Sequence, residues 1–423
     1  MNKTIGDIKE RGIVLYGNVD ENREFLHSYN QKLNIKGIMV DDRNDIEMQS
    51  FSEWNTQAFL FKEMQLTEEL IVICDKANFG QLQNRLEHAG KCEYRDYISA
   101  ECVEALLFEK KLLVCMGTHL LKQVALLLRN CKKIAEEYSV VYFAESDIKA
   151  PYRNRMQEQR HLGRLCDVYV YSDCEKKRYS SKKLEREALK QDCKMISVAD
   201  YGFGGYFPQY ERNRDAVSRY MLGVFVELGD FELKSMDYET NAFHKTDREI
   251  EKLCLQGIEL EEAIKKLLDV QYFKAEDVAD HFAEEVRRFK ELEVHADIKL
   301  GAFIEQHQKE CLCRNLNEWN EPIISYVVEQ LARILEIPPV QMNTEECRLL
   351  IEEESGTELP VYPGVEKALG LQERLKDKKY KITTYAGSKY LDIEECIRYH
   401  ASYLYRAWDF MKFTKMNEKL RDN

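Results

Sequence analysis

The sequence predicts an α/β protein with two parallel-sheet units, Rossmann-like or flavodoxin-like, and a C-terminal helical subdomain. Three observations predict this class. Short apolar runs alternate with amphipathic helix patterns as far as Asp200, as they do where crossover helices connect parallel strands. From Asp247 onward the apolar residues repeat with a helical period. With 423 residues, 44% of them hydrophobic, the chain is too long for one ordinary core, so several domains are expected.

The first unit is expected over residues 1–108. Strands are predicted at Gly12–Asn18, Lys36–Asp42 and Glu69–Asp75, with helices at Glu21–Leu33 and Phe79–Ala89. Gly17 stands where a phosphate-binding turn would lie, and Asp41 and Asp42 end the second strand, where a ribose hydroxyl is often held. Only one glycine of the G-x-G-x-x-G fingerprint is present, so a Rossmann-like domain without a bound nucleotide is favoured over a nucleotide-binding one.

The second unit is expected over residues 109–245. Its predicted strands are Leu112–Gly117, Val140–Ala144, Asp167–Ser172 and Lys194–Asp200, with helices near His119–Cys131 and Ser181–Leu189. Three strands end in polar or glycine-containing turns, which begin at Gly117, Ser172 and Asp200. Because the carboxyl ends of parallel strands share one edge, we expect these turns to converge on a crevice, which is the best candidate site.

The aromatic segment YGFGGYFPQY, Tyr201–Tyr210, leaves the last of these strands without a helix. We expect it to form a loop that closes over a ligand.

Helical periodicity marks residues 246–340. One stripe carries Val278, Phe282, Val286 and Phe289, which is the spacing of a face packed in a core. A further helix is predicted over about Ile323–Leu335, with Pro322 suited to its first turn. The remaining residues, 341–423, are expected to form an extension that wraps the rest of the chain or an oligomer partner. Whether the protein forms a homo-oligomer stays open.

Charge and composition limit the partners. The net charge of -13 argues against nucleic-acid binding, because no basic face is present to neutralise phosphates. The N-terminus lacks the apolar region of an export signal and no apolar run approaches the ~20 residues of a membrane span, so a cytoplasmic location is expected. The 13 cysteines are scattered, and we expect reduced, mostly buried thiols and no metal.

Several separated motifs then carry a family resemblance. In order, the chain has the turn Gly117-Thr118-His119, the motif GYFP at Gly205–Pro208, and Asn320-Glu321-Pro322 at the entry to a helix. This order resembles the WcbI family of polysaccharide-biosynthesis proteins, whose motifs read like Gly-Asn-Cys-Gln, Tyr-Phe-x-Gly-Tyr-Phe-Pro and Asn-His-Pro. The resemblance covers roughly Lys111 to Ile337, and the preceding part is similar to Rossmann-like domains attached to sugar-modifying enzymes.

The resemblance implies binding of coenzyme A or acetyl-CoA and O-acetyl transfer to a sugar of a capsular or cell-surface polysaccharide precursor. It also implies a catalytic pair, His119 as general base and Glu321 as its partner, because these residues stand where the family has cysteine and histidine. The family's covalent scheme therefore cannot be carried over intact. The residues that the resemblance and the shared sheet edge assign to cofactor binding are Gly117, Thr118, Ser172, Tyr201, Gly205 and Tyr206.

Simpler interpretations stay open for the individual residues. His119 would also fit as the first residue of a helix, Thr118 as its N-cap, and Glu321 as an acidic residue favoured by the helix dipole. Cys115 lies inside a strand and is expected to be a buried thiol.

Two other function classes stay open. One is an SGNH-like carbohydrate esterase with Ser172 as nucleophile, although the chain has no G-x-S-x-G elbow. The other is a non-catalytic member that binds carbohydrate or nucleotide.

Overall fold

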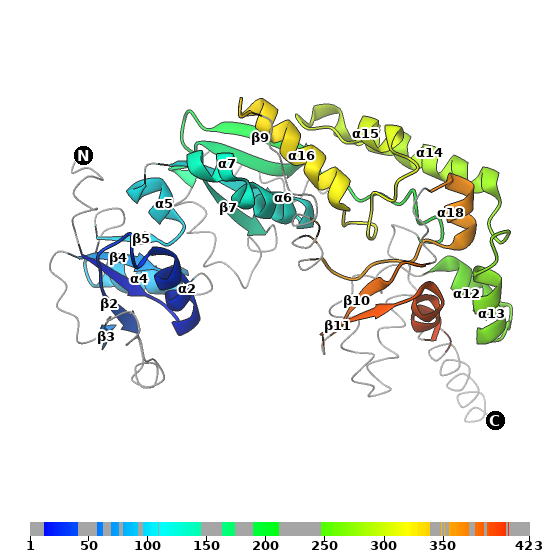
Figure 1. Ribbon diagram of the computed structural model, residues 1–423, viewed down its shortest axis with the longest axis horizontal. Coiled ribbons are helices and arrows are strands. Elements are labelled where there is room, and N and C mark those ends of the chain that lie inside the picture. The colour runs from blue at the N-terminus through cyan, green and yellow to red at the C-terminus, as the bar shows by residue number, and fades with distance from the viewer. Residues whose placement is uncertain are drawn as a thin grey trace, which may run out of the picture. The chain divides into compact units, whose positions relative to one another are not determined.

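The computed structural model describes the greater part of the chain, in these ranges: 12–40, 57–61, 69–75, 79–91, 96–108, 110–144, 163–173, 189–210, 247–338, 348, 351, 355–371, 377–384, 387–402 and 405. Figure 1 shows the helices and strands of the described residues. The chain divides into two compact units. The first contains residues 1–198 and 332–342, and the second contains 199–331 and 343–423.

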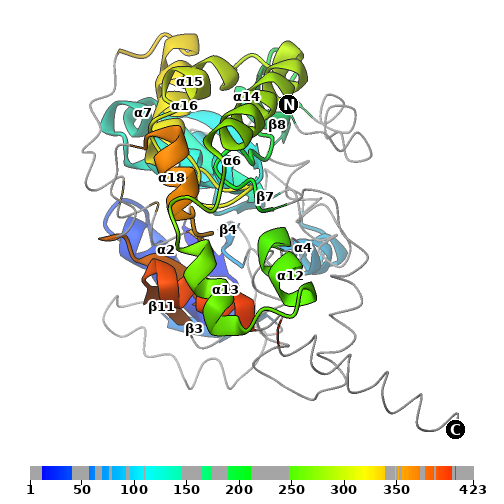
Figure 2. The same ribbon diagram turned by 90° about the vertical axis from the view of Figure 1, so that its right-hand side faces the viewer.

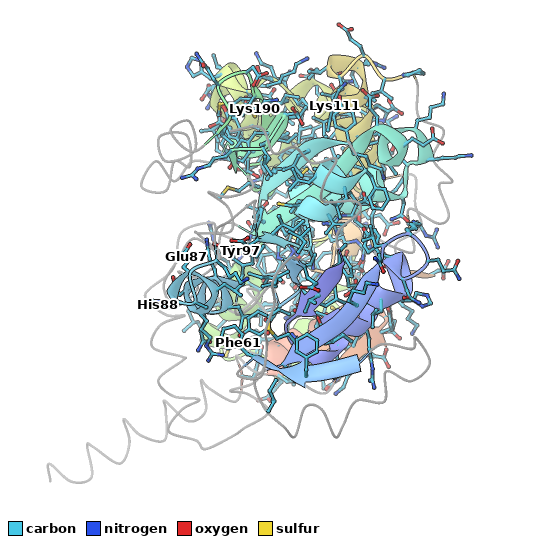
Figure 3. All side chains as sticks on the ribbon, turned by 90° about the vertical axis from the view of Figure 1, so that its left-hand side faces the viewer. Phe61, Glu87, His88, Tyr97, Lys111 and Lys190 are labelled. Atoms are coloured by element: carbon cyan, nitrogen blue, oxygen red, sulfur yellow. The ribbon has the colours of Figure 1, made fainter. Side chains whose placement is uncertain are left out.

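The first unit begins with a five-stranded sheet in which every neighbouring pair is parallel, in the order β3-β2-β1-β4-β5. The strands are β1 (Ile13–Tyr16), β2 (Ile35–Val40), β3 (Gln57–Leu60), β4 (Leu70–Ile73) and β5 (Tyr97–Ser99). Two crossover helices are described, α2 (Val19–Tyr29) and α4 (Phe79–His88). The Tyr97 hydroxyl of β5 donates a hydrogen bond to Glu87 of α4 over 3.0 Å (Figure 3). This strand order is that of the Rossmann fold and has its topological switch point between β1 and β4.

A four-stranded sheet follows in the same unit, in the order β7-β6-β8-β9. Its strands are β6 (Lys111–Gly117), β7 (Tyr138–Ala144), β8 (Val168–Asp173) and β9 (Lys194–Ala199), with α6 (His119–Asn130) and α7 (Lys132–Glu137) between β6 and β7. β6 pairs in parallel with both β7 and β8. β6, the first strand of this sheet along the chain, therefore lies in the interior of the sheet. The topological switch point of the sheet is between β6 and β8, as in flavodoxin-like folds.

The two sheets of the first unit share one hydrophobic core. Helix α5 (Cys102–Leu107) contacts β5 of the first sheet and β6 and β7 of the second. Its Val103 and Leu107 are fully buried, and the apolar cluster around them includes Leu15 of β1 and Val114 of β6. Burial of apolar surface on both sides of α5 fixes the two sheets to one another.

The second unit is mainly helical. Its helices are α12 (Arg248–Leu255), α13 (Leu260–Leu267), α14 (Ala275–Leu292), the 3-10 helix η6 (Glu293–His295), α15 (Gly301–Gln306), α16 (Glu321–Ile334) and α18 (Pro363–Leu369). α18 lies against α14, and α12 against α13 (Figure 2). The last turn of α16 belongs to the first unit. The predicted apolar stripe of α14 is buried, with Phe289 fully so.

The C-terminal part of the chain is built into this second unit. The Tyr362 hydroxyl donates to Asp247 over 2.5 Å, and the Leu359 amide donates to the Arg314 carbonyl over 2.8 Å. β10 (Tyr380–Thr384) and β11 (Gly387–Leu391) form an antiparallel hairpin. The extension thus wraps the body of its own chain.

The predicted fold class is confirmed, because both parallel sheets and the helical part are present. The division into units differs from the four predicted segments, since residues 1–108 share a unit with the second sheet. Asp41, Asp42 and most of the predicted helix at Ser181–Leu189 lie outside the described residues.

Among the helices that the structure describes, none has the length and apolar character needed to cross a bilayer. Nine of the ten described cysteines are buried, and all ten are free thiols.

Candidate active site at the β6–α6 turn

The candidate site is the turn that joins β6 to α6. Thr118 is the N-cap residue of α6 and has an extended backbone conformation, but its hydroxyl makes no capping hydrogen bond. His119 is the first residue of the helix. The Tyr142 hydroxyl lies 3.0 Å from the Gly117 carbonyl oxygen and 3.3 Å from that of Thr118, and it donates to this pair. A side chain from the neighbouring strand therefore holds the turn in place.

Gly117 and Ser172 bring the ends of β6 and β8 together. A Cβ atom on Gly117 would lie 2.0 Å from the Ser172 Oγ and 2.9 Å from its Cβ. Glycine is thus required by the close approach of the serine side chain. This contact lies at the switch point of the second sheet, as the sequence predicts for the candidate crevice.

The electrostatics of α6 suit an anion at its start. The first turn contains no acidic residue, His119 is exposed, and Lys122 follows one turn later. The first N–H groups of a helix have no intrahelical partner and carry the positive end of the helix dipole. With no side-chain cap, these amides can hold a phosphate or an oxyanion.

Helix α2, at the equivalent position of the first sheet, has the opposite character. Its N-cap Asn18 accepts a hydrogen bond from the Glu21 amide over 3.0 Å, and Asp20 and Glu21 occupy the first turn. A pyrophosphate would meet a capped helix and two carboxylates there. The start of α2 therefore does not suit the pyrophosphate of a dinucleotide.

Glu321 is the first residue of α16, and its Oε1 accepts a hydrogen bond from the Ser325 hydroxyl one turn later, over 2.8 Å. His119 belongs to the first unit and Glu321 to the second. The pairing of these two side chains stays a prediction.

A family model described as "Polysaccharide biosynthesis enzyme WcbI" matches residues 124–340 of this chain. That span covers more than half of the 423 residues. The chain belongs to the WcbI family.

A solved structure of WcbI agrees with this assignment at the level of the fold. It is described as a novel polysaccharide biosynthesis enzyme, in native form without a disulfide bond between coenzyme A and one of its cysteines. The likeness has a TM-score of 0.53 at 14% sequence identity and covers 70% of this chain and 90% of the other. No curated protein matches the chain. The family span begins at Val124, after the β6–α6 turn, so the equivalence of His119 to the family's cysteine stays a prediction.

This WcbI-family chain carries no cysteine in the turn itself. Cys115 precedes it inside β6, is fully buried, and has its thiol pKa raised to about 12 by burial. A thiol in that state is neither a nucleophile nor accessible to coenzyme A at neutral pH. The prediction that Cys115 is a buried core thiol is confirmed.

The aromatic segment packs as core. Tyr206 is fully buried, its ring lies edge-on to Phe203 and Phe282, and its hydroxyl donates to the Glu310 carbonyl over 2.6 Å. The Tyr201 hydroxyl donates to the Leu292 carbonyl over 2.9 Å.

Gly205 is buried in the same cluster, where a Cβ would lie 2.5 Å from the Phe203 ring. The segment is a loop without a helix, as predicted, and its aromatic rings find their apolar partners inside the second unit. Closure of this loop over a ligand stays a prediction. A role of Tyr201, Gly205 and Tyr206 in cofactor binding stays a prediction.

Two residues beside the turn were not predicted from the sequence, Tyr142 of β7 and Lys122 of α6. Tyr142 lies in the predicted strand VVYFA, where nothing in the sequence marks its hydroxyl. Lys122 had a signal, because it stands three residues after His119 and so shares its helix face.

Proposed function

We propose that this chain binds an acyl-CoA at the β6–α6 turn and transfers the acyl group, acetyl in the simplest case, to a sugar hydroxyl of a polysaccharide precursor in the cytoplasm. The observation that carries the proposal is the uncapped start of α6, free of acidic residues in its first turn, at the switch point of the second sheet. Membership in a family of polysaccharide biosynthesis enzymes supports a polysaccharide precursor as the substrate.

The residues at the turn fit the anionic part of coenzyme A. The amides at the start of α6 are donors, and His119 and Lys122 add basic side chains on the same face. When bound, the thioester would supply an activated carbonyl carbon next to these donors. Gly117 adds no side chain at the end of β6, and the Ser172 hydroxyl lies directly beside it.

The proposed chemistry is direct transfer with general-base catalysis. His119 accepts the proton of the sugar hydroxyl as its oxygen attacks the thioester carbonyl, and the proton then passes to the departing thiolate sulfur. The amides at the start of α6 stabilise the oxyanion that develops. Glu321 would hold the second ring nitrogen of His119 and stabilise the imidazolium. With Cys115 buried and protonated, no covalent cysteine intermediate is part of this scheme.

Transfer of labelled acetyl groups from acetyl-CoA to a panel of sugars tests the proposal. We expect His119→Ala to lower the rate by roughly 10²–10⁴-fold, the usual contribution of a general base. His27→Ala removes an exposed histidine of α2 and serves as the matched control, with an unchanged rate expected. Equal rates in the wild type and His119→Ala would contradict the role of His119.

The same assay separates the esterase alternative, for which Ser172 would be the nucleophile because its hydroxyl lies at the turn. A transferase requires the sugar acceptor, whereas an esterase releases acetate without it. Acetate release that needs no acceptor and is abolished by Ser172→Ala would favour the esterase over the transferase.

A further inference from the structure

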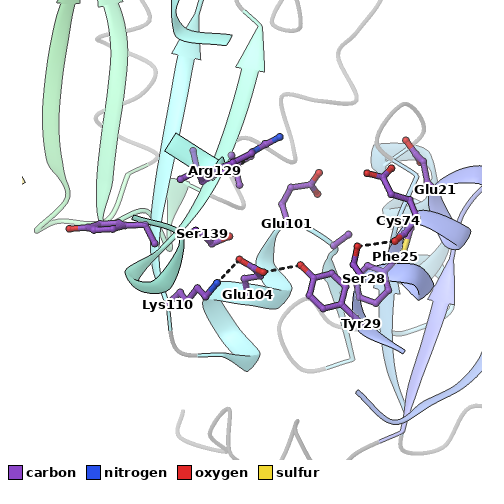
Figure 4. Close-up of a pocket in the computed structure, with 16 residues that line it drawn as sticks. Glu21, Phe25, Ser28, Tyr29, Cys74, Glu101, Glu104, Lys110, Arg129 and Ser139 are labelled. Carbon is purple, nitrogen blue, oxygen red and sulfur yellow. Dashed lines mark hydrogen bonds and ion pairs between the residues drawn. The ribbon is translucent and has the colours of Figure 1, made fainter. Parts of the chain in front are cut away.

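A second pocket lies within the first unit, away from the β6–α6 turn (Figure 4). It has a volume of about 340 Å³ and is lined by α2, by the residues that follow β4 and β5, by α5, and by the end of α6 with β7. Cys74 and Ala100, which follow β4 and β5, place it at the carboxyl edge of the first sheet. Ligands of open α/β sheets bind at this edge, and the volume is at the small end of the ~300–1,000 Å³ range of small-molecule sites.

Three polar side chains that line the pocket are linked by hydrogen bonds. Lys110 Nζ lies 3.1 Å from Glu104 Oε2, and the Tyr29 hydroxyl donates to Glu104 Oε1 over 3.1 Å (Figure 4). Burial, with the neighbouring charges of Glu104 and Glu101, raises the pKa of Tyr29 well above its usual value. Tyr29 is therefore a permanent donor, and the three side chains are preorganised by one another.

Arg129 provides the free donor of the pocket. Its Nε donates to the Val140 carbonyl over 2.8 Å, which orients the guanidinium. Its two terminal amino groups make no hydrogen bond or ion pair with the residues that the structure describes. A guanidinium held by one nitrogen presents a rigid pair of donors to a ligand.

Carboxylates supply the acceptors. The pocket lining contains four carboxylates, which are Glu104, Glu21, Glu24 and Glu101, and two cations, Lys110 and Arg129. An excess of negative charge repels phosphate and carboxylate ligands and favours hydroxyl or ammonium donors. The capped and acidic start of α2 excludes phosphate from the same sheet edge.

An apolar surface lies beside these polar groups. The rings of Phe25 and Tyr29 are 4.7 Å apart, and both line the pocket with Tyr138. Aromatic faces next to converging donors and acceptors match a sugar, which has C–H faces as well as a rim of hydroxyl groups that both donate and accept.

We infer that this pocket binds a sugar unit, neutral or amino-substituted and without a phosphate or carboxylate group, through Arg129, Glu104 and the Phe25–Tyr29 rings. The pocket and the β6–α6 turn lie at opposite ends of α6, whose 12 residues span about 18 Å. The sugar bound here is therefore not the unit that would accept an acyl group at His119. The inference stands without the proposed acyl transfer.

Saturation-transfer NMR on the full chain tests the inference, with methyl glucoside, N-acetylglucosamine, glucosamine and ATP as probes. We expect at least one sugar to receive saturation, and binding to weaken by about tenfold in Arg129→Gln and Glu104→Gln, since each removes a charged hydrogen-bonding group. Glu136→Gln, an exposed carboxylate of α7 outside the pocket, is the matched control and should bind as the wild type. Arg129 is exposed and makes one hydrogen bond to the protein, so its variant should fold, which thermal unfolding checks.

Three outcomes would overturn the inference: none of the sugars binds, sugar binding is unchanged in both pocket variants, or ATP displaces the bound sugar. Titration of acetyl-CoA into Arg129→Gln separates the two sites, because coenzyme binding at the start of α6 should be unaffected. Loss of sugar binding with retained coenzyme binding supports the separate pocket.

Discussion

Gly117 is the residue on which the shape of the candidate site depends most. A methyl group at this position would collide with both side-chain atoms of Ser172, so we expect Gly117→Ala to destabilise the protein by about 1–3 kcal/mol, as overpacking does. In a Ser172→Gly background the same substitution should be at least about 1 kcal/mol less damaging, because the colliding atoms are gone. Denaturant unfolding of the four proteins gives this coupling energy, and a coupling near zero would mean that the strand ends do not meet as described.

Asp247 predicts a pH dependence of stability. Its carboxyl group is buried, and burial raises its pKa to about 7 although the Tyr362 hydroxyl and the Ile250 and Glu249 amides donate to it. The native state therefore keeps a proton that the unfolded chain releases above pH 3.8. The free energy of unfolding should fall as the pH rises from about 4 to about 7, by up to about 1.4 kcal/mol per unit, and then level off.

Asp247→Asn isolates this effect, because an amide keeps the capping oxygen of α12 but does not titrate. The difference in unfolding free energy between wild type and variant should vary with pH only between about 4 and about 7. Asp269→Asn is the control, since Asp269 is exposed and likewise accepts a backbone amide, that of Gln271. A difference that does not change with pH would show that Asp247 is already ionised in the folded protein.

At the residue scale, the sequence predicted the position of the candidate turn and missed what holds it. Gly117, His119 and Ser172 were found because strand ends in a parallel sheet share one edge. Tyr142 was missed because its hydroxyl acts across a strand pairing that only the folded sheet creates. The pocket residues Lys110, Glu104 and Tyr29 come from separate elements, and no local spacing links them.

The starts of α2 and α6 give a prediction at the scale of elements. Asn18 caps α2 with its side chain, whereas Thr118 makes no such bond at α6. We expect Asn18→Ala to lower the unfolding free energy by about 1 kcal/mol and Thr118→Ala by clearly less. Chemical denaturation of the two variants checks this. If Thr118→Ala were the more damaging change, the side chain of Thr118 would stabilise the start of α6 more than Asn18 stabilises that of α2, which would contradict this contrast.

Elements with a strong pattern were the ones predicted well. Apolar runs placed β1, β2, β4 and the second sheet, and helical periodicity placed α14 and α16. The strands β3, with the sequence QAFL, and β5, with the sequence YIS, lack the unbroken apolar run that marks β1 and β4, so the sequence did not predict them. The burial of the aromatic segment at Tyr201–Tyr210 was not predicted, because it depends on contacts with α14 and Trp319, which are far away in the sequence.

At the scale of the whole molecule, the two parallel sheets differ in charge at their helix starts. The first sheet carries a capped, acidic start in α2, and the second an uncapped start in α6 that has no acidic residue in its first turn. This contrast favours the proposed anion site at the second sheet and an uncharged or cationic ligand at the first. With both proposed sites occupied, the chain would hold an activated donor and a sugar at once.

The central claim is that the start of α6 binds the acyl donor, and calorimetric titration with acetyl-CoA tests it most directly. We expect the wild type to bind and Lys122→Glu to raise Kd by at least about tenfold, because a carboxylate then faces the phosphates. Lys133→Glu, the same charge reversal on the exposed face of α7, should leave Kd unchanged. Absence of binding at millimolar acetyl-CoA, or equal Kd values in both variants, would contradict the account.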